Sequence, residues 1–303
     1  MYACLVRTIA IAALVGATMP TESAGQPRAT HDKAFWQSIA ANKYAPPVGE
    51  PIEPLVRELS SLLGSPDPEL RDDIAYSTLV SWIYRQKLVS VEQRRALVGE
   101  WIDNLSVGIG STGSDDVLRR SFSALALGIT AILDNEAPYL DRAEFDRMLQ
   151  AALTYLAAEK DIRGFDAAKG WVHATAHTAD LIKFLARSRY LEPARQKDVL
   201  TAISTRMGAV ETVFTDGEDE RLARAVLSIV ARSDFDEAGF RAWVGTVGPV
   251  RPAGSPTRAE MARNQNRKNL VVALYAVLST DARDLPGIRA ARAIVLERMK
   301  TFM

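Results

Sequence analysis

The chain has 303 residues, and its 37 Lys and Arg residues balance its 37 Asp and Glu residues, which gives a formal net charge of zero. Nucleic-acid-binding proteins carry a basic patch or stripe, and this composition indicates none. The length allows one large domain or an array of helical repeats.

The first 25 residues have the character of a cleaved export signal. Arg7 supplies a positive charge, the uncharged and mostly apolar stretch Thr8–Met19 follows, and small residues then offer cleavage positions. About a dozen apolar residues suit a signal peptide and are too few to span a bilayer stably. The alternative is a mildly apolar helix that frays. We expect a periplasmic or secreted protein whose mature chain has no membrane-spanning helix and, because Cys4 is the only cysteine, no disulfide.

Helical periodicity dominates the rest of the chain. Residues 26–50 are expected to form a short helix, Asp32–Asn42, and a linker, and residues 51–303 to form a single helical-repeat domain. No segment alternates convincingly with a period of two, so no strands are expected. Apolar spacing and capping residues predict further helices at Glu53–Leu63, Glu69–Gln86, from Ser90 onward, and at Asp115–Leu133, Asp141–Ala158, Lys169–Ala186, Pro193–Phe214, Glu218–Arg232, Glu237–Val247, Arg258–Leu278 and Leu285–Phe302.

About a dozen helices joined by short turns indicate an all-α fold. Paired helices with a period near 40 residues favour a HEAT- or armadillo-like α-solenoid of antiparallel helix pairs. A closed α/α barrel, built from the same helical hairpins, is the alternative.

The most informative segment is Glu159–Asp180, because it holds two of the three histidines of the chain. His173 and His177 are four residues apart and Asp180 follows three residues later, so on the predicted helix the three side chains share one face. A histidine pair with this spacing can bind zinc through two ring nitrogens. Asp180 is better placed to orient His177 than to act as a third ligand.

Three interpretations of the histidine pair remain open: packing, a metal-free polar pocket, and a zinc site whose third ligand would be Asp161 or Glu159. No His-Glu-x-x-His or Gly-x-Ser-x-Gly motif is present. Apart from the zinc alternative, no cofactor is expected. A salt bridge that fixes the local loop is the simplest explanation for Asp161 and Arg163, whereas Glu220 or Arg221 could reach the histidine region.

Five blocks of this chain closely resemble a bacterial family known as domain of unknown function 2785. They are Ser65–Tyr76, Asp116–Ser123, Glu159–Gly164, Lys169–Asp180 with its Lys-Gly-Trp-x-His-x-x-x-His pattern, and Glu218–Leu222. The resemblance implies an all-helical, HEAT-like fold and supplies no established activity or ligand. It also brings together one polar set, which consists of Asp72, Arg120, Asp161, Arg163, Lys169, Trp171, His173, His177, Asp180, Glu220 and Arg221.

These observations lead to three functional hypotheses. The first is an exported binding protein that holds a small polar molecule or a peptide in a concave pocket. Its predicted ligand-binding residues are Arg120, Asp161, Arg163, Lys169, Trp171, His173, His177, Asp180 and Glu220. The second is a hydrolase or metal-dependent enzyme in which His173 or His177 is the general base and Asp180 orients it. The third is a scaffold that binds another protein and has no such site.

Overall fold

The structure is a computed structural model that describes residues 31–251 and 253–303. The predicted export signal at residues 1–25 lies outside these residues. The described part of the chain is built from α-helices and one two-stranded hairpin, which confirms the predicted all-α fold. None of its helices is long and apolar enough to cross a membrane.

The helices follow one another with short connections. In chain order, the structure contains α1 (Lys33–Ala41), α2 (Ile52–Leu62), the π-helical segment η1 (Glu69–Tyr76), α3 (Ser77–Leu79), the π-helical segment η2 (Val80–Arg85), α4 (Val91–Asn104), α5 (Asp116–Glu136), α6 (Arg142–Ala158), α7 (Ala174–Leu185), α8 (Pro193–Ala209), α9 (Glu218–Val230), α10 (Glu237–Thr246), α11 (Arg258–Thr280) and α12 (Pro286–Met299). Strands β1 (Phe165–Asp166) and β2 (Gly170–Trp171) lie between α6 and α7.

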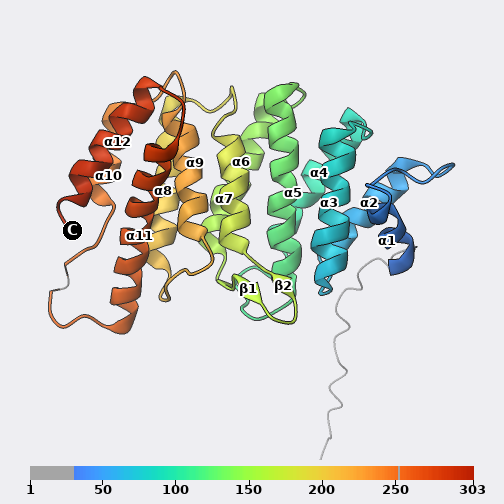
Figure 1. Ribbon diagram of the computed structural model, residues 1–303, viewed down its shortest axis with the longest axis horizontal. Helices are drawn as coiled ribbons and strands as arrows, with labels where there is room; N and C mark the ends of the chain where they lie inside the picture. Colours follow the sequence, from blue (N-terminus) through green and yellow to red (C-terminus); the bar gives the residue numbers. More distant parts are fainter. Residues whose placement is uncertain (1–30, 252) are drawn as a thin grey trace, which may run out of the picture.

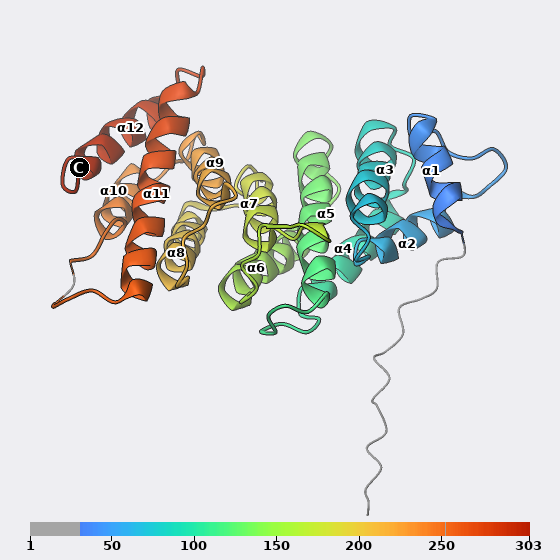
Figure 2. The same ribbon diagram turned by 60° about the horizontal axis from the view of Figure 1, so that its bottom comes forward.

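The helices form an open array of two rows. In one row α5 packs on α7, α7 on α9 and α9 on α11, while α4, α6, α8 and α10 follow one another in the second row. Helices α1 and α12 lie at opposite ends of the array in both views (Figures 1 and 2). The described chain is therefore open and not a closed α/α barrel. The finer assignment to HEAT- or armadillo-type repeats stays a prediction.

Capping residues explain why several helices begin where the sequence predicts. The Asp141 side chain accepts a hydrogen bond from the Glu144 amide while the Glu144 carboxylate accepts one from the Asp141 amide, a reciprocal pair that satisfies two helix-end donors. Asp32 caps α1 in the simpler way, by accepting from the Phe35 amide. Pro193 lies in the first turn of α8, where its missing N–H has no cost.

The core runs along the array between the two rows. Its largest fully buried aromatic residues are Trp36, Trp82, Trp101, Phe122, Phe145 and Phe240, which come from six different helical segments. Helix α5 is buried on most of its surface because neighbouring helices from both rows cover it. This central position makes α5 the wall against which the site described below is built.

The predicted helix Lys169–Ala186 is wrong at its start. Helix α7 begins at Ala174, and residues 165–171 form an antiparallel hairpin in which Phe165 pairs with Trp171, so the expectation of no strands is also wrong. Gly170 has φ +68° and His173 has φ +50°, left-handed conformations that cannot continue an α-helix. His173 is the residue before the helix and not part of its face, but its ring still contacts that of His177, with the centroids 5.6 Å apart.

Candidate functional site

His173 is held in place by the chain around it. Its Nε2 lies 2.8 Å from the Asp216 carbonyl oxygen, and because a carbonyl can only accept, Nε2 carries the proton. The Trp171 indole stacks on its ring with the centroids 4.6 Å apart, and Glu218 Oε1 lies 3.8 Å from Nε2. The imidazole is buried and connects the hairpin to the segment before α9.

His177 is buried and uncharged. Ser121 Oγ lies 2.8 Å from its Nδ1 and also donates its single proton to the Val172 carbonyl, so Nδ1 must be the donor to Ser121. Burial lowers the pKa of His177 well below the usual range, and the neighbouring His173, Arg221 and Arg71 lower it further. The Ser121–His177 pair resembles a nucleophile and its base only in composition, because Ser121 is fully buried and its proton is committed to the backbone.

The predicted role of Asp180 as the orienting partner of His177 is wrong. Its carboxylate forms ion pairs with Lys183, at 2.7 Å, and with Arg221 from α9. A general base must reach a substrate proton, and both imidazoles are enclosed and engaged in hydrogen bonds. This geometry favours a structural role for the histidine pair.

Neither Glu159 nor Asp161, the two predicted candidates, is free to act as the third ligand of a zinc site. Glu159 forms a buried, bidentate pair with Arg120, with Nε–Oε2 at 2.7 Å, and Asp161 pairs with Arg163 at 2.7 Å. Among residues 31–251 and 253–303, no group of three or more His, Cys, Asp or Glu side chains is placed to hold a metal ion. The Asp161–Arg163 bridge is the loop-fixing contact that the sequence predicts, and Arg120 is enclosed and unable to reach a ligand.

Arg71 completes a cluster that we call the latch, which consists of Arg71, Ser121, Trp171, His173 and His177. The Arg71 guanidinium is fully buried and donates to the carbonyls of Ser65, Lys169 and Trp171, and so ties η1 to the hairpin. Three elements far apart in sequence, η1, α5 and the segment before α9, are thus fastened to the residues that precede α7. The latch positions helices and presents no open pocket.

Two other predicted site residues also have local partners. Lys169 forms an ion pair with Asp115, and Glu220 pairs with Arg224 one turn along α9 at 2.6 Å. Trp171 is 39% exposed, and its ring contacts the exposed Phe165 at the surface of the hairpin. The structure therefore brings the predicted residues into a set of structural contacts, and within the polar set Asp180 and Arg221 also line a cavity.

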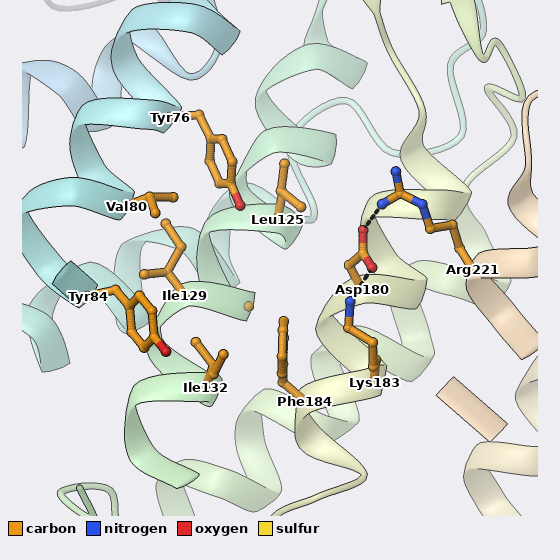
Figure 3. A pocket seen from close by; sticks show the side chains of 11 residues that line it. Tyr76, Val80, Tyr84, Leu125, Ile129, Ile132, Asp180, Lys183, Phe184 and Arg221 are labelled. Carbon is orange, nitrogen blue, oxygen red and sulfur yellow. Dashed lines mark hydrogen bonds and ion pairs between the residues drawn. The ribbon is translucent and has the colours of Figure 1, made fainter. Parts of the chain in front are cut away.

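That cavity lies between η1, η2, α5, α7 and the start of α9 and has a volume of about 290 Å³ (Figure 3). Its wall is mostly apolar. The lining residues are Tyr76, Val80, Tyr84, Leu125, Gly128, Ile129, Ile132, Asp180, Lys183, Phe184 and Arg221. We call this space the aromatic cavity because Tyr76, Tyr84 and Phe184 border it.

One end of the aromatic cavity is charged. The Asp180 carboxylate pairs with both Lys183 and Arg221, so the three side chains together carry a net charge of +1. The Arg221 side chain is 43% exposed. Figure 3 shows the ring of Tyr76 extending beside Leu125 into the cavity. No hydrogen bond with the described residues engages its hydroxyl. Burial raises the pKa of Tyr76, with a smaller contribution from the charge of Asp180, so the hydroxyl stays a donor.

Sequence reasoning missed most of this cavity. A signal was present, since Tyr76, Val80 and Tyr84 are spaced by four residues and therefore lie along one helix face. The sequence gives no sign that this face adjoins Ile129 and Phe184, because the contact joins three separate helical segments.

A family model described as "Protein of unknown function (DUF2785)" matches residues 105–276 of this chain. The matched span is more than half of the chain and contains the α5, α7 and α9 walls of the aromatic cavity, while η1 and η2 precede it. No curated protein and no solved structure matches the chain.

Proposed function

We propose that this chain, which belongs to the DUF2785 family of proteins of unknown function, binds an amphipathic ligand in the aromatic cavity. The observation that carries the proposal is that an apolar wall meets the charged side chains of Asp180, Lys183 and Arg221 beside the Tyr76 hydroxyl, which has no hydrogen-bond partner among the described residues (Figure 3). Ligand sites in proteins commonly combine a mostly apolar lining with a few convergent polar groups.

The lining specifies the chemistry of the ligand. Ile129, Leu125 and Phe184 offer an apolar surface to an aromatic or branched aliphatic group. At the charged end, Tyr76 can donate one hydrogen bond, and Arg221 can donate hydrogen bonds to an anionic or carbonyl oxygen. The ligand that fits is therefore a small molecule or peptide segment with an apolar group next to an oxygen acceptor.

The latch supports this site from behind. It fixes the chain that enters α7, which carries Asp180 and Phe184, and the segment that enters α9, which carries Arg221. A binding site gains affinity when its groups are held in position before the ligand arrives. The pocket proposed here thus lies beside the histidine segment and not within it.

Export remains part of the proposal. The charged and then apolar composition of residues 1–25 supports a cleaved signal and a periplasmic or secreted location. Fractionation with N-terminal sequencing of the mature protein tests it: a start between about residues 18 and 26 agrees with the usual length of such signals, and an intact Met1 on cytosolic protein contradicts it.

Binding can be tested with N-acetyl-phenylalanine and its amide by saturation-transfer NMR on the full chain. We expect transfer to the ring protons of both probes. Val80→Trp places a large side chain at the half-buried wall of the cavity and should abolish the transfer. Val272→Trp, the same substitution at a 39% exposed position on α11, is the matched control and should leave it intact. Absence of transfer, or equal transfer with both variants, would contradict the proposal.

A further inference from the structure

A second hollow adjoins the aromatic cavity, and half of the residues that line it are basic. It has a volume of about 570 Å³ and lies between α7, α9 and the segment that follows α11. Lys183 and Phe184 line both spaces, so the two hollows are neighbours along α7. We call it the basic hollow, after Lys183, Arg187, Arg224, Arg232 and Arg283.

The carboxylates nearby neutralise only part of this positive charge. Glu220 pairs with Arg224, Asp234 with Arg232 and Asp281 with Arg283, at 2.6 to 2.7 Å. The charge of Lys183 is only partly neutralised by Asp180, because Arg221 binds the same carboxylate. Arg187 has no ion pair with any described residue. The hollow therefore keeps an excess of positive charge.

The Arg187 guanidinium is held in position but retains N–H donors without a partner among the described residues. Its Nε donates to Ser228 Oγ at 3.1 Å, and its guanidinium lies 5.2 Å from the centroid of the Phe184 ring. Its terminal nitrogens form no hydrogen bond within the described part of the chain. A guanidinium held in this way presents two parallel N–H donors, which match the two oxygens of a carboxylate.

The surroundings of Arg187 also favour an incoming anion. Arg187 is exposed to solvent, but partial desolvation by its neighbours lowers its pKa, and the positive charge of Arg283 lowers it further. Two guanidinium groups close enough to repel each other are stabilised when a negative group lies between them.

We infer that the ligand is an extended acidic peptide, whose apolar side chain fills the aromatic cavity while a glutamate or aspartate side chain binds Arg187 in the basic hollow. This inference rests on the function proposed above and names its ligand class. Two adjoining hollows with different chemistry suit a linear chain that presents different side chains in succession. Arrays of helices offer extended surfaces of this kind.

The test is fluorescence anisotropy with dye-labelled peptides and the full chain. Each peptide carries one phenylalanine and one glutamate separated by zero to three alanines, and each has a partner peptide with glutamine in place of glutamate. At the best spacing we expect the glutamate peptide to bind about tenfold more tightly than its glutamine partner, as one charge-assisted, bidentate contact allows. Arg187→Gln should remove that difference and leave the affinity for the glutamine peptide unchanged.

Arg241→Gln is the matched control, because Arg241 is an exposed arginine that pairs with Glu237 on α10, away from both hollows. It should preserve the tenfold preference. Equal binding of glutamate and glutamine peptides, or an equal effect of the two arginine substitutions, would overturn the inference. If no peptide binds while N-acetyl-phenylalanine amide still does, the acidic-peptide inference fails and the aromatic cavity stands as a small-molecule site.

Discussion

Removal of the Ser121 hydroxyl should destabilise the protein far more than the loss of one exposed hydroxyl. Ser121 is fully buried, donates to the Val172 carbonyl and accepts from His177 Nδ1. Ser121→Ala leaves two buried polar groups without partners, and each costs about 1–3 kcal/mol. Partial relaxation of the latch would reduce the sum, so we expect a loss of roughly 2–4 kcal/mol in the free energy of unfolding.

Urea denaturation of the full chain, followed by circular dichroism, measures this loss. Ser38→Ala is the control, because Ser38 lies exposed on α1 and its hydroxyl donates to the Phe35 carbonyl in the same helix. An exposed change of this kind is expected to stay within about 0.5 kcal/mol. Because the latch holds the chain that carries Asp180 and Phe184, any weakening of ligand binding by Ser121→Ala should accompany this loss of stability. A loss no larger than that of Ser38→Ala, or a loss of ligand binding at unchanged stability, would refute the structural role of the latch.

Three further predictions follow from buried or unpartnered groups. Burial depresses the folded-state pKa of His177, so at low pH the unfolded chain binds one more proton than the folded chain. Stability should therefore fall as the pH drops below about 6.5, with a slope of up to about 1.4 kcal/mol per pH unit from this residue. His177→Gln should flatten that slope in denaturation curves, and an unchanged slope would contradict a buried, neutral His177. Arg120→Met leaves the buried carboxylate of Glu159 without its cation and should cost about 3–5 kcal/mol in the same assay. Adding Glu159→Met should recover part of the loss, because the Val107 carbonyl and the Asp161 amide still lose their partners; no recovery would argue against a mainly ionic role of the pair. Tyr76→Phe should leave stability within about 0.5 kcal/mol, because its hydroxyl has no partner among the described residues, yet weaken N-acetyl-phenylalanine binding; a large loss of stability would show that the hydroxyl has a structural role.

The helices were largely predictable because their signals are local. Capping residues and apolar spacing place α6 at its observed end, Ala158, and place α9 and α10 within two residues of their observed bounds. The predicted start of α7 failed because the conformation of His173 depends on distant partners. The Asp216 carbonyl and the buried Arg71 fix the chain before α7, and neither contact follows from the local sequence.

The candidate site was predictable only in part. Residue types and the family resemblance single out the polar cluster, and the structure confirms that Asp161 and Arg163 pair and that Arg221 reaches the histidine region, where it binds Asp180. Spacing alone could not show that these groups satisfy one another. A satisfied cluster and an open pocket contain the same residue types, and only the three-dimensional partners separate them.

The aromatic cavity depends on helix packing that the sequence does not encode in any local pattern. Tyr76 and Phe184 are more than a hundred residues apart and meet only because η1 and η2 lie beside α5, which lies beside α7. Knowing which faces of these helices adjoin is the information that the structure adds.

Photo-crosslinking tests the central claim most directly. The full chain is irradiated with N-acetyl-4-benzoylphenylalanine, whose aromatic ketone reacts with neighbouring C–H bonds, and the modified residues are mapped by mass spectrometry. Our account predicts saturable labelling within residues 76–84, 125–132 and 184, with competition by N-acetyl-phenylalanine and loss in Val80→Trp. Labelling confined to the exposed aromatic pair Phe165 and Trp171, or to the apolar groove between α4 and α6, would contradict it.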